Sequence, residues 1–454
     1  MELKDLFLTP LYLGIFYAIA FAVRKRFTNS LTRKYFIPAL SLKFLGAIGL
    51  GLIYQFYYGG GDTFNYFFHT KVIYGAFGDS FSTGLKLLTS QHPPDADMLR
   101  YTGQMYWYDA PTEYTVIQVA SFFALFCFDT YTVIALCFAF TSFCGVWAMY
   151  VTFVKLYPTA YKKLAIAVFF LPSVFFWGSG LMKDSLCLGA LGWAFYGFYH
   201  VFIDKKNIFT AAVLGGLGVY ILLSVKVYIL LSFLPPALLW IFNENNQRIK
   251  SATTRMLLKP LFLILGLGAG YVGATGLTAG DEKYDVEKIG ERTKINQQYL
   301  THYVANGSAY NIGDFDGSMG SLVKVGPQAI VVSLYRPFLF EARNPIMLLS
   351  ALEATLFIWL TVSLFYRTGL LKGFQLILGK PILTFSFLFS IIFAIGVGIN
   401  SGNFGTLVRY KIPLMPFYLA ALYIMQAMAS AKKAPARRPQ LNNPRKLRRL
   451  ATTE

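Results

Sequence analysis

Charged residues are scarce in this sequence, and so are the residue patterns that soluble enzymes use for catalysis. Only 14% of the 454 residues are charged, whereas about a quarter are charged in soluble domains. The four cysteines lie in apolar segments without CxxC or Cys/His spacing, and the four histidines are scattered, so the local sequence offers no metal cluster. A glycine-rich nucleotide loop and a GxSxG motif are also missing. Any chemistry is therefore left to membrane helices and the loops between them.

Apolar residues are abundant, and they form runs long enough to cross a membrane. The hydrophobic share is 56%, the aromatic share is 17% and the mean hydropathy is +0.50. An apolar helix of about 20 residues crosses the ~30 Å hydrocarbon core. We therefore predict an all-α, polytopic integral membrane bundle of about 11–13 transmembrane helices, with amphipathic helices on its outer face. The candidate spans are 6–23, 35–58, 113–128, 131–153, 164–178, 185–203, 208–224, 226–242, 260–279, 345–366, 381–400 and 412–430.

The basic residues gather in short loops and at the C-terminal end. The formal net charge of +19 would by itself suggest a nucleic-acid partner. Lysines and arginines beside membrane helices are, however, typical of cytoplasmic anchors near anionic lipid, so we expect membrane lipids and no nucleic acid as partners. The pattern predicts a transmembrane domain, residues 1–430, with inserted outer segments 59–112 and 280–344, and a basic cytoplasmic tail, residues 431–454, without fixed structure.

Strict alternation of the spans places three polar stretches on one outer side: the break at 178–184, the segment 280–344 and the loop 401–411. The basic loop 24–34 conflicts with this count, because a cytoplasmic loop there and a cytoplasmic tail require an odd number of crossings. Either 64–89 contains an additional crossing or re-entrant segment, or 113–128 does not span the membrane fully.

One apolar helix breaks at Gly178 and Gly180 and is followed at once by Lys183 and Asp184. A charge at the bilayer centre costs ~2.5 to 3.5 kcal/mol on insertion scales, so we expect this pair at a water-exposed break between two helices. The positive end of the next helix and a lysine would together suit a phosphate. A glycine-rich turn with a charge pair that caps and anchors helices is the alternative.

Further candidate residues lie in the other polar stretches. Asp62 follows three glycines, and Tyr66 comes one helical turn later. Arg336 and Glu341 precede a span, where a charged residue usually anchors the helix at the interface. Arg409 stands at the irregular entry to the last span, where a guanidinium suits bidentate phosphate or carboxylate binding. Its alternative role is to reach toward lipid head groups.

With these residues in place, the chain resembles the polytopic bacterial proteins that include GT-C-type glycosyltransferases and EpsG-like or Wzy-like polysaccharide polymerases. The matching parts are Gly60-Gly61-Asp62-Thr63, the break at 178–184, and the Arg-Tyr-x-x-Pro element that runs from Arg409 to Pro413. The stretches PSVFFWGSGLMKD and YRPFLFEARNP also resemble those of membrane proteins from the Bacteroidetes. The motifs cover a small part of the chain, and the architecture covers most of it.

The resemblance implies a membrane glycosyltransferase or polymerase that acts on polyprenyl-phosphate-linked sugars at the outer face of a bacterial inner membrane. Asp62 would act at the acceptor hydroxyl or help to hold a divalent metal ion, and cations would neutralise the departing lipid phosphate. The residues expected to bind that phosphate are Lys183, Arg336, Arg409 and Tyr410, and the secondary candidates are Tyr66, Asp184 and Glu341.

Two other classes of protein fit the same charges. A transporter or flippase for a lipid-linked or anionic solute would use them as a binding site without chemistry, and a cavity lined by Lys43 and Lys226 would favour it. A structural or assembly subunit would instead dock a partner through 280–344. Asp314 and Asp316 in that segment could ligate a metal ion or cap a turn.

Overall fold

The computed structural model describes residues 2–89, 94–245 and 318–433, together with residues 264, 268, 295, 309–310 and 312–313. Within these residues every regular element is a helix, apart from an isolated bridge between Ala309 and Asn403, so the expected all-α fold is confirmed. Outside them lie most of the span expected at 260–279, Asp314 and Asp316, and the tail from residue 434 on. The division into a membrane domain and a tail therefore stays a prediction.

Eight helices of the described residues are long and apolar enough to cross a membrane, and a bent pair of helices makes a ninth candidate. The chain is therefore a multi-pass membrane protein. The eight are α1 (Leu3–Phe27), α2 (Arg33–Phe56), α7 (Tyr131–Leu156), α10 (Lys183–Phe198, continued by a π-helical segment, Tyr199–Asp204), α11 (Ile208–Val225), α12 (Val227–Asn245), α16 (Pro345–Thr368) and α18 (Pro381–Asn400). The bent pair is α19 (Phe404–Tyr410) and α20 (Met415–Lys433), which meet at 67°.

Two of the spans expected from the sequence are shorter helices, and the candidate spans among the described residues are correspondingly fewer than the 11–13 expected. α6 (Pro111–Cys127) has 17 residues and a length of ~25 Å, less than the ~30 Å hydrocarbon core. This length favours the alternative in which 113–128 does not span fully. The expected span 164–178 is divided into α8 (Tyr161–Phe169) and α9 (Pro172–Trp177), because Pro172 has no N–H with which to continue the helix.

The centre of the bundle is formed by α7 and α10, which pack closely through glycines. A Cβ at Gly145 would lie 1.9 Å from the carbonyl oxygen of Gly189, and a Cβ at Gly192 would lie 2.1 Å from the carbonyl oxygen of Gly145. Small residues let two membrane helices approach until their backbones touch, which supplies the van der Waals contact that holds helices together in lipid. This packing fixes the start of α10, where Asp184 lies in the first turn.

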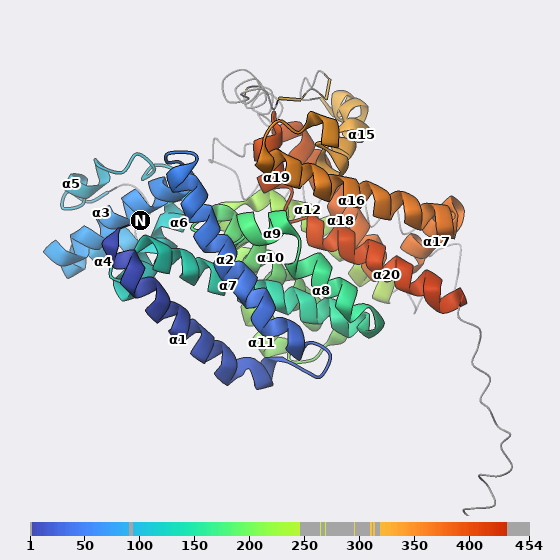
Figure 1. Cartoon of the computed structure of the whole chain (residues 1–454), viewed down its shortest axis with the longest axis horizontal. Helices are drawn as coiled ribbons and strands as arrows, with labels where there is room; N and C mark the ends of the chain where they lie inside the picture. Colours follow the sequence, from blue (N-terminus) through green and yellow to red (C-terminus); the bar gives the residue numbers. More distant parts are fainter. Residues whose placement is uncertain are drawn as a thin grey trace, which may run out of the picture.

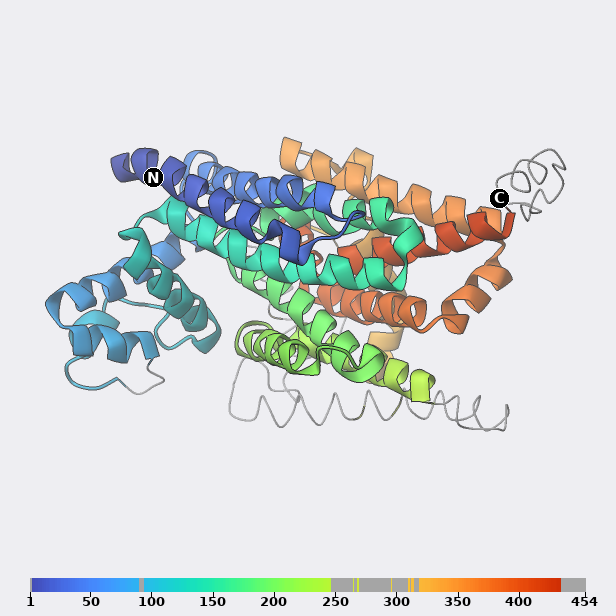
Figure 2. The same ribbon diagram turned by 90° about the horizontal axis from the view of Figure 1, so that it is seen from below.

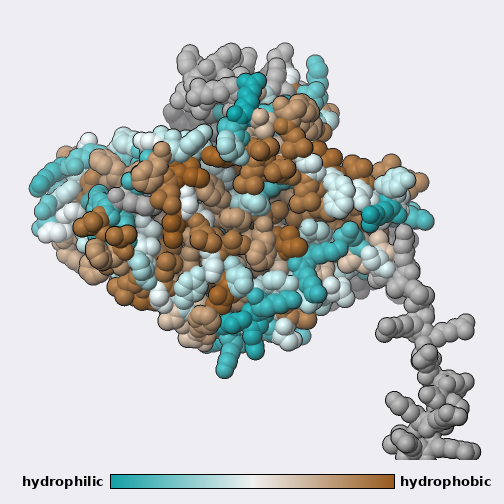
Figure 3. Space-filling model, in the orientation of Figure 1, coloured by the Kyte–Doolittle hydropathy of each residue, from teal (hydrophilic) through white to brown (hydrophobic). Residues whose placement is uncertain are grey.

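Shorter helices lie at both ends of the long ones. Figures 1 and 2 show a lobe at one end that consists of α3 (Asp62–Asp79), α4 (Phe81–Thr89), α5 (Leu99–Thr102) and α6, whereas α17 (Leu370–Gly379) lies at the other end. α15 (Met319–Tyr335) and α19 lie at the top of Figure 1. In Figure 3, hydrophobic residues cover the middle of the visible face, and hydrophilic residues collect at the left edge and at the bottom. This distribution is what a bundle surrounded by lipid requires.

Candidate functional site

Three interruptions between helices bring charged residues together. They lie between α9 and α10, between α11 and α12, and between α19 and α20. The first precedes Asp184, the second contains Lys226, and the third follows Arg409 closely. A break is present, since α9 and α10 are separated by residues 178–182. The expected exposure to water is wrong, because residues 178–182 are buried in the bundle and Lys183 and Asp184 belong to the first turn of α10. Charged side chains within membrane helices are tolerated where they face such interior breaks and one another.

Arg409 is at the centre of the charged cluster. It lies in the last turn of α19, a short helix whose start is capped by the side chain of Asn403. Its Nη2 donates to Asp62 Oδ2 at 3.0 Å and to Asp184 Oδ2 at 3.4 Å, and its Nη1 donates to the Tyr54 hydroxyl at 3.3 Å. One guanidinium therefore joins two carboxylates that are 347 and 225 residues away in the sequence.

Asp62 reaches Arg409 because of the three glycines before it. Gly59, Gly60 and Gly61 have φ values of +70°, +140° and +122°, which side chains other than hydrogen rarely allow. A Cβ at Gly61 would also lie 2.9 Å from the ring of Tyr54. The turn places Asp62 at the first position of α3, where the helix dipole favours a carboxylate. The Asp62 side chain is 46% exposed, so its carboxylate is accessible to a substrate.

The second carboxylate of the cluster is buried and doubly bound. The Asp184 side chain is 2% exposed; its Oδ1 accepts from Lys226 Nζ at 2.5 Å, and its Oδ2 accepts from Arg409. Lys226 Nζ also lies 5.1 Å from the ring centroid of Tyr410. A buried charge is stable only with a close partner. The Asp184–Lys226 pair is therefore held in place, and Asp184 in turn positions Arg409.

Lys183 points to a different acid from its neighbour in the sequence. Its Nζ donates to Glu113 Oε1 at 2.5 Å and to Thr112 Oγ1 at 2.8 Å, and the two charged side chains are largely buried. Both acceptors lie in the first turn of α6. Lys183 thus links the lobe to α10, one residue before Asp184.

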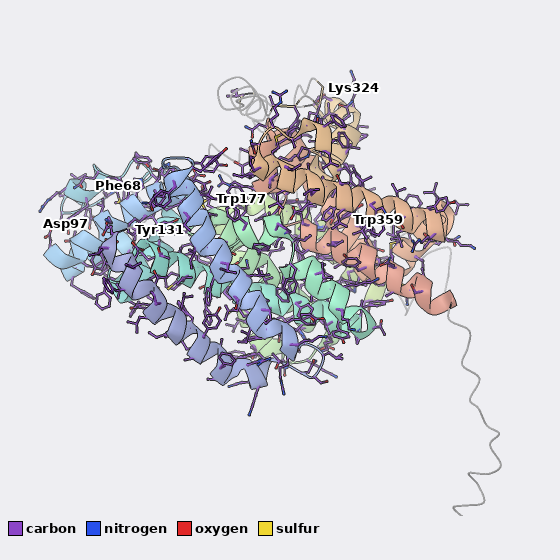
Figure 4. The ribbon with its side chains drawn as sticks, in the orientation of Figure 1. Phe68, Asp97, Tyr131, Trp177, Lys324 and Trp359 are labelled. Carbon is purple, nitrogen blue, oxygen red and sulfur yellow. The ribbon has the colours of Figure 1, made fainter. Side chains whose placement is uncertain are left out.

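Aromatic side chains surround the guanidinium. The Trp177 ring centroid lies 5.6 Å from Arg409 Cζ, and the ring packs edge-on against Tyr54. Figure 4 shows Trp177 near the middle of the molecule, between the α3 region and α16. Tyr66 is buried beside the cluster, and burial raises the pKa of its hydroxyl well above the usual value, with nearby carboxylates, Glu113 first, adding to the rise. The Tyr66 hydroxyl therefore stays protonated and able to donate at neutral pH.

Arg336 belongs to a second ion pair. Its Nε donates to Glu341 Oε2 at 3.1 Å, its Nη2 donates to Glu341 Oε1, and the Phe338 N–H donates to the same carboxylate at 2.8 Å. Burial raises the pKa of Glu341, but the hydrogen bonds from Arg336 and the Phe338 N–H outweigh it and leave the pKa below its usual value. The Arg336 guanidinium lies 5.1 Å from the ring of Phe404, at the start of α19. The ion-pair partner of Arg336 is thus Glu341, whereas that of Asp62 is Arg409.

The structure thus brings together some of the residues singled out from the sequence and separates others. Joined directly or through one shared side chain are Asp62, Asp184, Arg409 and Tyr410, with Tyr66 beside them. Lys183, Arg336 and Glu341 lie in other ion pairs. Glu113, Tyr54 and Trp177 were not singled out as site residues, because each lies within an expected span; Trp177 is also part of the stretch PSVFFWGSGLMKD.

Among the described residues, no group of three or more His, Cys, Asp or Glu side chains is arranged to hold a metal ion. The chain is a polytopic helical membrane protein. No family model matches its sequence, and no match is found among the curated proteins or the solved structures.

Proposed function

We propose that this protein is an integral membrane glycosyltransferase or polysaccharide polymerase that uses polyprenyl-phosphate-linked sugars at the outer face of a bacterial inner membrane. One observation carries the proposal: a half-exposed carboxylate, Asp62, lies 3.0 Å from the guanidinium of Arg409, which comes from the far end of the chain. Transfer from a phosphate donor needs a base at the acceptor and a positive charge at the departing phosphate. The two groups supply both within one site.

In the proposed reaction, Asp62 accepts the proton of the acceptor hydroxyl. The hydroxyl oxygen forms a bond to the anomeric carbon of the donor sugar, and the bond from that carbon to the phosphate oxygen breaks. The electron pair of that bond leaves with the phosphate, where Arg409 stabilises the added negative charge. The aromatic rings of Trp177 and Tyr54 lie beside Arg409 and lower the local dielectric constant, which strengthens the interaction between the guanidinium and the phosphate.

The buried pair of Asp184 and Lys226 takes a positioning role in this scheme. Asp184 holds Arg409 Nη2, and Lys226 neutralises the charge of Asp184 that Arg409 leaves unbalanced. Lys183 is neutralised by Glu113, so its part in this scheme is to hold the lobe against α10 beside Asp184.

The contacts of Lys43 argue against the transporter alternative. Lys43 is buried, and its Nζ donates to Ser142 Oγ at 3.0 Å and to the Gly178 carbonyl at 2.5 Å. These bonds tie α2 to α7 and to the break before α10. Lys226 is similarly bound to Asp184. Both lysines thus have structural partners, and neither supports the cavity that the transporter alternative requires.

The proposal is tested with purified full-length protein in liposomes that contain a panel of undecaprenyl phosphate and diphosphate sugars. Release of the lipid carrier is measured by mass spectrometry. We expect wild-type protein to release it, and Asp62→Asn to lose about 10²-fold or more of the rate, the usual contribution of a general base. Asp79→Asn is the matched control, because Asp79 ends the same helix and is 53% exposed.

Two results would overturn the proposal. One is carrier release by Asp62→Asn at the wild-type rate. The other is movement of labelled lipid between the leaflets by the wild-type protein without any carrier release, which would identify a flippase.

A further inference from the structure

The guanidinium of Arg409 has an unused donor on the edge that holds its carboxylates. Nε and Nη2 lie on the same edge of an arginine side chain, and this edge matches two oxygens of a phosphate or carboxylate. Nη2 donates to both Asp62 and Asp184. Nε is buried and has no hydrogen-bond acceptor among the described residues. A buried donor without an acceptor is costly, so this edge lacks a partner that a two-oxygen anion would supply.

The two carboxylates on this edge differ in how firmly they are held. Asp184 is 2% exposed and has a second cation, Lys226, at 2.5 Å. Asp62 is 46% exposed, and within the described part of the chain Arg409 is its only ion-pair partner. Solvent reaches Asp62 and screens its charge, whereas Asp184 is buried with two cations, so Asp62 is the ligand of Arg409 that exchanges more easily.

The chain before Asp62 also permits a shift of this residue. Gly59 and Gly60 have positive φ values, and a Cβ at either would meet no atom within 4 Å. The space around this turn is therefore open, and glycine adopts a wide range of backbone conformations.

We propose that Asp62 occupies the place of the donor phosphate on Arg409, and that a phosphate or diphosphate displaces it and binds Nε and Nη2 together. The inference rests on the proposed function and adds a coupling to it. Displacement frees the Asp62 carboxylate from its counter-ion only when a donor is bound, so the base becomes available only then. Asp184 and Lys226 stay in place and keep the guanidinium oriented.

This exchange predicts that one substitution at the site, Asp62→Asn, increases the affinity for a diphosphate. An internal competitor lowers the apparent affinity of a site by the fraction of time that the competitor is absent. For an ion pair with one solvent-exposed member we take this factor as about two- to fivefold. Asp62→Asn removes the competitor and the repulsion between its charge and the ligand. It should therefore bind a diphosphate about two- to fivefold more tightly, although it loses turnover.

The experiment measures dissociation constants of farnesyl diphosphate and of inorganic pyrophosphate with the full-length protein in lipid nanodiscs. Wild type, Asp62→Asn, Asp79→Asn and Arg409→Lys are compared. We expect tighter binding by Asp62→Asn, no change for Asp79→Asn, and at least tenfold weaker binding by Arg409→Lys, which loses the two-donor edge. Tighter binding of both probes identifies the phosphate as the recognised group, whereas tighter binding of farnesyl diphosphate alone adds the prenyl chain to it.

Unchanged or weaker binding by Asp62→Asn would overturn the exchange, as would wild-type protein that binds neither probe. The outcome is separate from that of the turnover assay. Tighter binding by Asp62→Asn without carrier release by wild type would keep the exchange and reject the transferase. Carrier release that depends on Asp62, without tighter binding, would do the reverse.

Discussion

Removal of Lys226 should destabilise the protein strongly, because it leaves the buried carboxylate of Asp184 with Arg409 as its one remaining ion-pair partner among the described residues. Asp184 is 2% exposed, and Lys226 Nζ lies 2.5 Å from it. Breaking a buried ion pair by removing one partner costs ~3–5 kcal/mol. Arg409 remains at 3.4 Å from the other oxygen of Asp184, so we expect Lys226→Met to cost about 3 kcal/mol, at the lower end of this range.

The assay is reversible unfolding of the purified protein in mixed micelles with increasing denaturing detergent. The double variant Asp184→Asn with Lys226→Met should cost less than the sum of the two single variants, because it removes both charges of the pair, whereas each single variant leaves one of them behind. Lys86→Met is the control, since Lys86 lies in an exposed ion pair with Asp95, and its midpoint should stay within error of wild type. A cost below ~1 kcal/mol for Lys226→Met, or strictly additive costs, would refute the reasoning.

Two more predictions concern the turn before Asp62 and a buried acid. Gly61→Ala should cost about 1–3 kcal/mol in the same unfolding assay and reduce carrier release, because φ is +122° and the new Cβ would meet Tyr54. The control Gly60→Ala has open space around the new Cβ and should retain more activity. Equal activities of the two variants would contradict the role of the Tyr54 contact. Burial raises the pKa of Asp129 to about 6, against about 3.9 in an unfolded chain. The folded state therefore binds a proton on Asp129 more tightly than the unfolded state does. The resulting gain in the free energy of unfolding is fully present below pH ~4 and is lost as the pH rises through 6. The thermal midpoint of Asp129→Asn relative to wild type should accordingly rise between pH 4 and pH 7, and a difference independent of pH would contradict this.

The helical, membrane-spanning character of the chain could be predicted because an apolar run of about 20 residues has few alternatives to a membrane helix. The same argument failed at 113–128 and 164–178, where the length of the helix depends on Pro172 and on packing in the lobe as well as on hydropathy. Sequence patterns measure how apolar a run is, and they do not show where tertiary contacts end a helix.

The candidate site could be predicted in part, because single charged residues are visible in the sequence and their tertiary contacts are not. Asp62 and Arg409 are charges beside apolar runs, so each could be identified alone, and their contact across 347 residues is a property of the fold. The partners of Lys183 and Arg336 could not be predicted, because each pairs with a specific acid that no local pattern identifies. A charge in a membrane protein is conspicuous in the sequence, whereas its counter-ion is set by packing.

The contact between Asp62 and Arg409 is the claim on which the proposed chemistry depends, and cysteine cross-linking tests it most directly. In a variant without the native cysteines, the pair Asp62→Cys and Arg409→Cys should be joined rapidly by a short bifunctional thiol reagent in native membranes. The control pair Asp79→Cys and Arg409→Cys should not, because Asp79 lies ~25 Å from Asp62 along α3. Equal cross-linking of the two pairs, or cross-linking of the control pair alone, would contradict the account.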